Sequence, residues 1–471
     1  MTASTDNKVQ AIVATARRDM TAWASKTPKE RGRHLLRVRD AVATGGAALV
    51  DQVVAATGQS RSDAWFEVMS ACTSLTWSAK AGPRHLRPRT LATRPFVLKK
   101  ATLHHQPLGV VGVITPWNYP VAVPMHSIPN ALVAGNIVVL KPDPLVADVA
   151  RLLAGLINSA GVDLVHVLPG GADVGDDLVR SGIDKIVFTG RSASGRQVMA
   201  AAAATLTPVL LELGGNDAMV VLDDADVRQA ARAAVGAAFF NAGQTCMAVQ
   251  RVVVSEARHD EFVGEALAAT RALDREYPRL REEQAALLTR RLADAVAAGA
   301  RVMAGGPAPD GSFLPAVVTD VPVDSDLFQA ENFGPVLTIV RATSEEHAVT
   351  LANSTPYGLA ASVITRNGKR GRRVAAALAA GTVDINDAVF GAGVPGVPFG
   401  GTGASGFGRQ KGVAGLREFT STKTIVRTRL PGAPSFAAVL MAGKAPEPAL
   451  LQRIVRLYWT SLSHKVKRKM R

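Results

Sequence analysis

The pattern of apolar and polar positions changes character at about residue 109. Over the first 80 residues, apolar side chains recur at helical spacing, as in LLRVRDAVATGGAALVDQVVAATG (35–58), which predicts helices. From residue 109 onward, short apolar runs rich in β-branched residues alternate with segments of helix length. Near-continuous apolar runs separated by helices are typical of a parallel sheet covered on both faces. The pattern therefore predicts an α/β fold built on a doubly wound parallel sheet.

Five apolar runs predict the strands of this sheet. They are GVVGVIT (109–115), NIVVLKP (136–142), LVHVLPG (164–170), KIVFTG (185–190) and PVLLELGG (208–215). Each run ends in Thr-Pro, Lys-Pro or glycine, and sheets of this kind bind ligands beyond the carboxyl ends of their strands. A second alternating series begins at AMVVL (218–222) and QRVVV (250–254) and continues to about residue 390. A second α/β region is therefore expected after the first.

Length, composition and cysteine usage place the chain among folded multidomain proteins. Its 471 residues are too many for one simple core, and 47% of them are hydrophobic. The two cysteines, Cys72 and Cys246, cannot form a disulfide framework, which favours a reducing compartment. The N-terminus lacks a signal pattern, and no run approaches the roughly 18 apolar residues of a membrane span. These features predict a cytoplasmic protein and give Cys72 a structural role.

The net charge of +15 is concentrated in two segments. Residues 427–471 hold ten Lys/Arg and one Glu, a net +9, and residues 84–100 hold six Lys/Arg and no acid, a net +6. The rest of the chain is therefore neutral, whereas a nucleic-acid-binding protein usually spreads its basic residues over a folded face. The charge distribution predicts a solvated basic tail and a basic strand, and no nucleic-acid partner.

The C-terminal tail, residues 431–471, can form an amphipathic helix. One face would carry Leu451, Val455, Tyr458 and Leu462, and the other Arg453, Arg456, Thr460 and Lys467. A basic face opposite an apolar one is typical of helices that lie on a membrane surface. The apolar face could equally dock on the protein's own subunits, so both interpretations stay open.

Two side chains are candidates for nucleophile and base. Cys246 follows an apolar helical segment in FFNAGQTCMA (239–248), among small residues that leave room for a substrate. A cysteine in that setting is either an activated nucleophile or a small buried hydrophobe. Glu212 ends an apolar run in LLELGG, where desolvation would raise its pKa and suit it to general-base catalysis. The alternative for Glu212 is a carboxylate paired with a nearby Lys or Arg.

Two further stretches could bind substrate or phosphate. Asn118 lies in TPWNYP directly after a strand, where a fixed amide could stabilise an oxyanion or could close an Asx-turn. The stretch FTGRSASG (188–195) follows a strand and opens a helix. Its glycines, Gly190 and Gly195, suit close approach of a phosphate to a helix N-terminus. This stretch is not the full GxGxxG pattern, so it is a weak dinucleotide signal by itself.

Taken in order, these stretches resemble the aldehyde dehydrogenase superfamily over nearly the whole chain. The matching motifs are PWNYP, VVLKP, FTGRSASG, LELGG, GQTC, ENFGPV, NSTPYGLAA and PFGGTGASGFGRQKG. The resemblance implies a doubly wound dinucleotide-binding domain, an α/β catalytic domain and a small β bridging element through which homodimers or homotetramers form. The expected ranges are 1–84 with 108–211, then 212–392, and then 85–107 with 393–430.

The resemblance also implies a mechanism. Cys246 matches the nucleophile that adds to an aldehyde and later carries a thioester. Asn118 and the backbone N–H of Cys246 match the oxyanion hole. Glu212 matches the base that activates water to hydrolyse the thioester, a residue that CoA-acylating relatives lack.

The implied cofactor is NAD or NADP, and no metal site is expected. Lys141 matches the residue that bonds the adenosine ribose, Glu331 the nicotinamide ribose contact, and Phe333 the wall beside the ring. Trp117 is expected to line the cofactor groove. The cofactor-binding set is completed by Gly190, Arg191 and Gly195.

Two departures from the family pattern bear on the choice between NAD and NADP. Many relatives read Lys-Pro-x-Glu, and the acid repels a 2′-phosphate, whereas KPDP places Pro144 there. Many relatives have serine where this chain has Arg191, whose guanidinium could pair with a phosphate or point to solvent. We therefore hypothesise that NADP is accepted.

The resemblance implies an aliphatic or aromatic aldehyde as substrate, long-chain aldehydes included, with succinate semialdehyde as the alternative. A rival from another class is a peripheral membrane or scaffold protein with a vestigial site. The intact set of Cys246, Glu212 and Asn118 argues against that rival.

Overall fold

The structure is a computed structural model that describes residues 5–94, 96, 98–273, 278–430, 449, 452, 453 and 456. The chain forms two compact units, Met1–His85 with Pro107–Thr420 and Leu86–Gln106 with Ser421–Arg471. The apolar face predicted for the C-terminal tail lies outside the described residues.

A six-stranded sheet forms the core of one half of the first unit. Its strands are β3 (Val110–Thr115), β4 (Ile137–Pro142), β5 (Val165–Val167), β6 (Lys185–Gly190), β7 (Val209–Leu213) and β15 (Gly406–Phe407). They lie in the order β15-β7-β6-β3-β4-β5, all parallel except β15. Every residue of β3 is buried, as expected for a central strand covered on both faces. The predicted parallel sheet is confirmed.

Helices pack on this sheet and on one another. The helices that contact its strands are α1 (Thr5–Ser25), α5 (Ala122–Ala134), α6 (Ala147–Asn158), α7 (Ala172–Arg180) and α8 (Ser192–Ala203). The others are α2 (Pro28–Thr44), α3 (Gly46–Thr57) and α4 (Arg61–His85), with the short η1 (Pro144–Val146) after β4. Thr27 and Glu30 form a capping box that fixes the start of α2.

A seven-stranded sheet forms the other half of the first unit. Its strands are β8 (Asp217–Val221), β9 (Val249–Ser255), β10 (Arg301–Pro307), β11 (Phe313–Thr319), β12 (Val336–Ala342), β13 (Ala360–Ile364) and β14 (Thr382–Ile385). They lie in the order β10-β11-β12-β9-β8-β13-β14, and only β10 is antiparallel to its neighbour. Successive strand residues enter different hydrophobic clusters: Val220 and Val253 join one, and Met219 and Val252 the other. This sheet is therefore also buried on both faces.

The helices of this half are α9 (Val227–Phe239), α10 (His259–Arg271), α11 (Glu282–Ala297), α12 (Asp326–Gln329), α13 (Glu345–Ala352) and α14 (Gly368–Ala377). Its short helical turns are η2 (Phe240–Gly243), η3 (Glu256–Arg258) and η4 (Gly391–Gly393).

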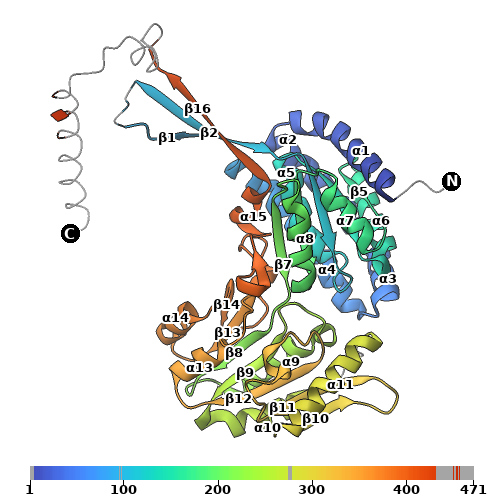
Figure 1. The fold of residues 1–471 in the computed structure, drawn as a ribbon, viewed down its shortest axis with the longest axis vertical. Helices are drawn as coiled ribbons and strands as arrows, with labels where there is room; N and C mark the ends of the chain where they lie inside the picture. The colour runs from blue at the N-terminus through green and yellow to red at the C-terminus, as the bar shows by residue number, and fades with distance from the viewer. Residues whose placement is uncertain are drawn as a thin grey trace. The chain divides into compact units, whose positions relative to one another are not determined.

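The link from β7 to β8 carries the chain from one sheet to the other (Figure 1). The link is short and glycine-rich because space is limited: a Cβ on Gly215 would lie 2.5 Å from the carbonyl oxygen of Cys246. The buried guanidinium of Arg251 donates to the Asn216 carbonyl at 2.8 Å and to the Ala352 carbonyl at 2.9 Å. The junction between the sheets is therefore held by backbone acceptors around one buried cation.

The second unit is built on a three-stranded sheet in the order β1-β2-β16. Its strands are β1 (Arg89–Leu91), β2 (Lys99–Pro107) and β16 (Thr420–Thr428), with β1 antiparallel to β2. Residues 393–420 were expected to belong to this bridging element, but they lie in the first unit. They form η5 (Gly403–Ser405), β15 and α15 (Gly412–Glu418), and β15 pairs with β7. No change in the hydrophobic pattern marks that boundary in the sequence.

Candidate active site

The carboxyl ends of the central strands meet at one edge of the six-stranded sheet. Ile114 pairs in register with Lys141, and Thr189 with Glu212. Trp117 and Asn118 follow directly after β3. The strand ends that the sequence singled out therefore lie side by side.

A left-handed turn separates Cys246 from the helix before it. After α9 ends at Phe239, the residues Asn241, Ala242 and Gly243 have φ of 51°, 54° and 69°. This conformation is unfavourable for residues with a Cβ. The amide of Asn241 donates to the Asn118 carbonyl at 3.2 Å, which helps to hold the turn. The sequence placed Cys246 at the end of the helix, and the structure inserts this turn between them.

Two cavities meet at Cys246 and Glu212. The first encloses about 670 Å³ and the second about 620 Å³. Five residues line both of them: Val123, Thr189, Glu212, Leu213 and Cys246. The residues that carry the thiol and the carboxylate therefore line both spaces.

Most of the residues expected to bind a cofactor line the first cavity. These are Trp117, Gly190, Arg191, Glu331 and Phe333, together with Asn118. Lys141 and Gly195 are not among its lining residues. Gly195 instead allows close packing of α8 on β7, because a Cβ there would lie 2.6 Å from Leu213 Cδ2.

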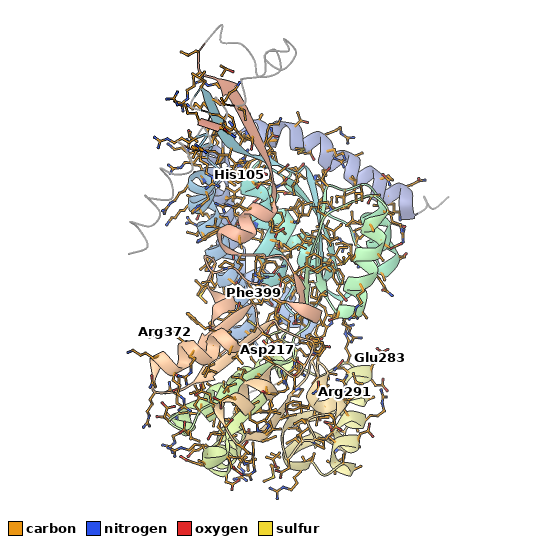
Figure 2. All side chains as sticks on the ribbon, turned by 60° about the vertical axis from the view of Figure 1, so that its left-hand side comes forward. His105, Asp217, Glu283, Arg291, Arg372 and Phe399 are labelled. Carbon is orange, nitrogen blue, oxygen red and sulfur yellow. The ribbon has the colours of Figure 1, made fainter. Side chains whose placement is uncertain are left out.

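Arginines give the first cavity a cationic wall. Besides Arg191, it is lined by Arg196, Arg281 and Arg291. The guanidinium of Arg281 lies 4.7 Å from the centroid of the Trp117 ring and 3.7 Å from the Asp143 carboxylate. Figure 2 shows Arg291 on α11, where Glu283 also lines this cavity. The sequence missed Arg196 on α8, Arg291 on α11 and Arg281 just before α11, because charged residues on or beside a helix usually face solvent.

This cavity fits a dinucleotide. Guanidinium groups bind phosphates. The N-terminus of α8 has no side-chain cap, so its backbone N–H groups can donate hydrogen bonds to an anion. The rings of Trp117 and Phe333 lie edge to face at 6.4 Å between centroids, next to Glu331 in the cavity wall. Burial raises the pKa of Glu331 to about 7, although the N–H of Gly215 and the nearby Arg191 oppose the shift. A dinucleotide would therefore meet cations, flat apolar faces and one acid that titrates near neutrality.

Glu212 is a buried carboxylate without a direct partner. It is 3% exposed, and within the described part of the chain neither of its oxygens has a hydrogen-bond partner. Burial raises its pKa well above the usual value, and the charges of Arg409 and Lys411 only partly counteract this. No ion pair involves Glu212 among the described residues, so the paired alternative is not observed there. Such a carboxyl is ready to take up a proton.

The thiol of Cys246 is half-buried and reduced. Burial raises its pKa to about 12, and the negative charges of Asp217, Glu331 and Glu212 add to the shift. At neutral pH the thiol is therefore protonated in the protein alone. Addition to a carbonyl then requires a group that removes the proton.

Lys411 is a buried cation beside this pair that the sequence gave no reason to select. Its ammonium lies 5.9 Å from the centroid of the Phe399 ring and donates to the carbonyl of Ala392. Burial lowers its pKa to about 8, and the negative charges of Cys246 and Glu212 counteract the shift. Lys411 therefore bears a positive charge at neutral pH, which favours the ionised forms of both Cys246 and Glu212.

The amide of Asn118 is held in one orientation. Its Nδ2 donates to the Gln244 carbonyl at 2.9 Å, which fixes which end of the amide is the donor. Its backbone carbonyl accepts from Gln59 Nε2 at 2.7 Å and from Asn241. One N–H of the amide thus serves the loop before Cys246, and the second can serve a ligand in the first cavity.

The second cavity is lined mainly by apolar side chains. They come from α4, η2, the residue before β13 and the segments on either side of η4, and include Phe66, Met69, Phe240, Leu359, Phe390 and Phe399. Figure 2 labels Phe399, which also lies 6.3 Å from His126 between ring centroids. Phe66, Met69 and Phe390 lie outside the stretches singled out in the sequence, whereas the other three lie within FFNAGQTCMA, NSTPYGLAA and PFGGTGASGFGRQKG.

A family model described as the aldehyde dehydrogenase family matches residues 1–425. The chain belongs to this family. Aldehyde dehydrogenases are oxidoreductases, and the two cavities around one cysteine agree with that class. The chain is 36% identical over 442 residues to "Putative succinate-semialdehyde dehydrogenase [NADP(+)] 2" of Mycobacterium ulcerans, covering 90% of this chain and 85% of the relative. It is 34% identical over 444 residues to the 4,4'-diapolycopene aldehyde oxidase of a Methylomonas species, covering 91% and 83%.

Solved structures show the same aldehyde dehydrogenase fold. An aldehyde dehydrogenase of Brucella melitensis superposes with a TM-score of 0.87 at 30% identity, covering 90% of each chain. The betaine aldehyde dehydrogenase of Staphylococcus aureus in complex with NAD+ superposes with a TM-score of 0.86 at 27% identity, covering 92% of this chain and 89% of the other. The α/β architecture expected from the motifs is thereby confirmed.

The described residues contain neither a membrane-spanning helix nor a cluster suited to a metal ion. None of the helices there combines the length and the hydropathy that crossing a bilayer requires. No cluster of three or more His, Cys, Asp or Glu in that part of the chain could hold a metal ion. Cys72 is half-buried, and burial raises the pKa of its thiol.

Proposed function

We propose that this chain oxidises an aldehyde to the carboxylic acid with NAD or NADP. The observation that carries the proposal is the meeting of two cavities at Cys246 and Glu212. A dinucleotide in the first cavity supplies the hydride acceptor, and the second cavity admits the aldehyde from a different side.

In the first step the sulfur of Cys246 adds to the aldehyde carbon. The thiol loses its proton to water or buffer, and the charge of Lys411 stabilises the resulting thiolate. The carbonyl oxygen becomes an oxyanion that the amide of Asn118 and the backbone N–H of Cys246 stabilise. Loss of hydride from this carbon leaves a thioester on Cys246.

In the second step water hydrolyses the thioester. Glu212 takes a proton from the water, the hydroxide adds to the thioester carbon, and the Cys246 sulfur leaves. The isolated, buried carboxylate suits this role because no fixed partner has to be displaced first. The products are the carboxylic acid and the free thiol.

Acceptance of NADP is part of the proposal. Pro144 replaces an acid that would repel a 2′-phosphate, and four arginines line the first cavity. The mycobacterial relative is also named for NADP(+). The names of the relatives point to different aldehydes, succinate semialdehyde and 4,4'-diapolycopene aldehyde, so succinate semialdehyde is the second candidate substrate.

We also propose a cytoplasmic homodimer or homotetramer, on the basis of the family resemblance and the two unpaired cysteines. Light scattering of the purified protein would give the mass of the assembly. A monomeric mass would contradict this part of the proposal.

The test measures reduction of the nicotinamide cofactor by its absorbance, with a panel of aldehydes as substrates. Wild-type protein should reduce NAD or NADP, and Cys246→Ser should lose at least about 1,000-fold in kcat because serine is the weaker nucleophile. Binding of the dinucleotide should survive the substitution, since the first cavity keeps its other residues. Undiminished turnover by Cys246→Ser would refute the mechanism.

A further inference from the structure

The rim and the floor of the second cavity differ in exposure. At the rim, Phe66, Met69 and Phe390 are 55%, 54% and 62% exposed. At the floor, Leu359 and Phe399 are 1% and 4% exposed, beside the reactive pair. An apolar path thus runs from open solvent to Cys246. Large exposed apolar side chains around a concave site indicate that something apolar binds there.

The carboxyl groups around this cavity, and its lack of a buried cation among the described lining residues, disfavour an acidic substrate. Four carboxyl groups line it, those of Asp63, Glu67, Glu212 and Asp387. Glu67 is 2% exposed and accepts the N–H groups of Val121 and Ala122 at 2.9 and 2.8 Å, so its oxygen atoms are fixed at the wall. A carboxylate on the substrate would enter a space already lined with acids.

Few of the described lining residues are cations that could attract a substrate carboxylate despite these acids. Arg232 is the only Lys or Arg there, and it is exposed on α9. His126 is neutral, because burial and the nearby Lys411 lower its pKa well below the usual value. Lys411 does not line the cavity and lies behind the Phe399 ring. A substrate carboxylate buried in this cavity would therefore lack a buried cationic partner among the described lining residues, which is costly.

We propose that the second cavity selects elongated, uncharged aldehydes with an apolar chain, and rejects aldehydes that carry a carboxylate such as succinate semialdehyde. The proposal rests on the proposed function, since it names the substrate class of the same site. A cavity of about 620 Å³ is larger than a four-carbon acid needs. The carbonyl lies at Cys246, and the chain extends along Phe399 and Phe240 to the rim at Phe66.

Gly236 offers a way to shorten this path without disturbing the fold. It lies on α9, lines the second cavity, and has no atom within 4 Å of a Cβ placed there. Gly264 on α10 is the matched control: it is also a mid-helix glycine with open space at its Cβ, and it lines none of the described cavities. Leucine at either position raises helix propensity, so both variants should fold.

The experiment measures kcat/KM for straight-chain aldehydes of increasing length and for succinate semialdehyde. In wild type, kcat/KM should rise about fourfold per added methylene until the cavity is filled. Succinate semialdehyde should be at least about 100-fold poorer than pentanal. Gly236→Leu should lower kcat/KM for dodecanal by about tenfold or more and leave propanal within about twofold, whereas Gly264→Leu should match wild type.

Each outcome decides between the two proposals. Equal or better use of succinate semialdehyde, or no gain with chain length, overturns the substrate class while the proposed function stands. The substrate class is also overturned if Gly236→Leu lowers propanal and dodecanal equally. Oxidation of no aldehyde at all by the wild type would overturn the proposed function itself. The wild-type series needs no variant, so the test holds even if Gly236→Leu does not fold.

Discussion

Replacement of Glu212 by glutamine separates the two chemical steps. Glutamine has nearly the same shape, so Glu212→Gln opens no cavity, and no described hydrogen bond or ion pair is lost because both oxygens lack partners. The charge and the basicity are removed. The chemistry should therefore change while the fold is kept.

The magnitude follows from the role of general base. Such a group contributes about 100- to 10,000-fold to a hydrolytic step, so kcat of Glu212→Gln should fall by that factor. Lys411 still supports ionisation of Cys246, so the oxidation step should persist with water or buffer as proton acceptor. The acyl group should then accumulate on Cys246.

Stopped-flow absorbance of the reduced nicotinamide would show this as a burst of about one equivalent per site, followed by very slow turnover. Mass spectrometry of acid-quenched enzyme would detect the thioester on Cys246. If turnover and burst are lost together in a folded, cofactor-binding variant, then Glu212 acts before hydride transfer. That result would refute its assignment to hydrolysis.

The same substitution has a signature in stability. The pKa of Glu212 is higher in the folded protein than in the unfolded chain. Its contribution to the free energy of unfolding is therefore complete below the unfolded pKa and is lost as pH rises through the folded pKa. Wild type should therefore lose stability with rising pH over that range, and Glu212→Gln should lose less. Thermal melts across pH should show a Tm advantage of the variant that grows toward alkaline pH.

Two other substitutions test the charges around the reactive pair. Arg191→Ser should lower kcat/KM for NADP about tenfold relative to NAD, as it removes a guanidinium from the cofactor cavity, and an unchanged ratio would show that Arg191 does not contact the 2′-phosphate. Lys411→Met should lower kcat/KM about tenfold near neutral pH, because Lys411 is charged below its pKa of about 8 and stabilises the ionised thiol. In wild type this contribution fades as pH rises through 8, so equal activity of Lys411→Met and wild type at every pH would contradict it.

The sequence predicted the strand ends because their signals are local. Apolar runs closed by glycine or proline mark where a buried strand stops, and parallel strands bring those stops to one edge. The sequence therefore predicted Glu212 and Asn118 at strand ends, and in the structure they lie at the ends of β7 and β3. Cys246 was a candidate because of its small neighbours, and the family motifs gave it the role of nucleophile, but no strand pattern could have brought it to that edge.

The second cavity could not be predicted in this way. Phe66 and Met69 lie on α4, far in sequence from Cys246, and only the packing of α4 near α9 makes them neighbours of one space. Their signal was weak: two large apolar residues on an exposed helix face. Lys411 gave no signal of its own in the sequence, since its burial depends on how the segment after β15 folds back.

The apolar lining of the second cavity also bears on how a catalytic cycle ends. The aldehyde enters without charge, but the acid that replaces it becomes an anion once it loses its proton. Among the acids around that anion, Glu67 is fixed at the wall, and the described lining supplies no buried cation. The cavity that binds the uncharged aldehyde should therefore bind the carboxylate product weakly. The product should leave readily and should inhibit the enzyme little.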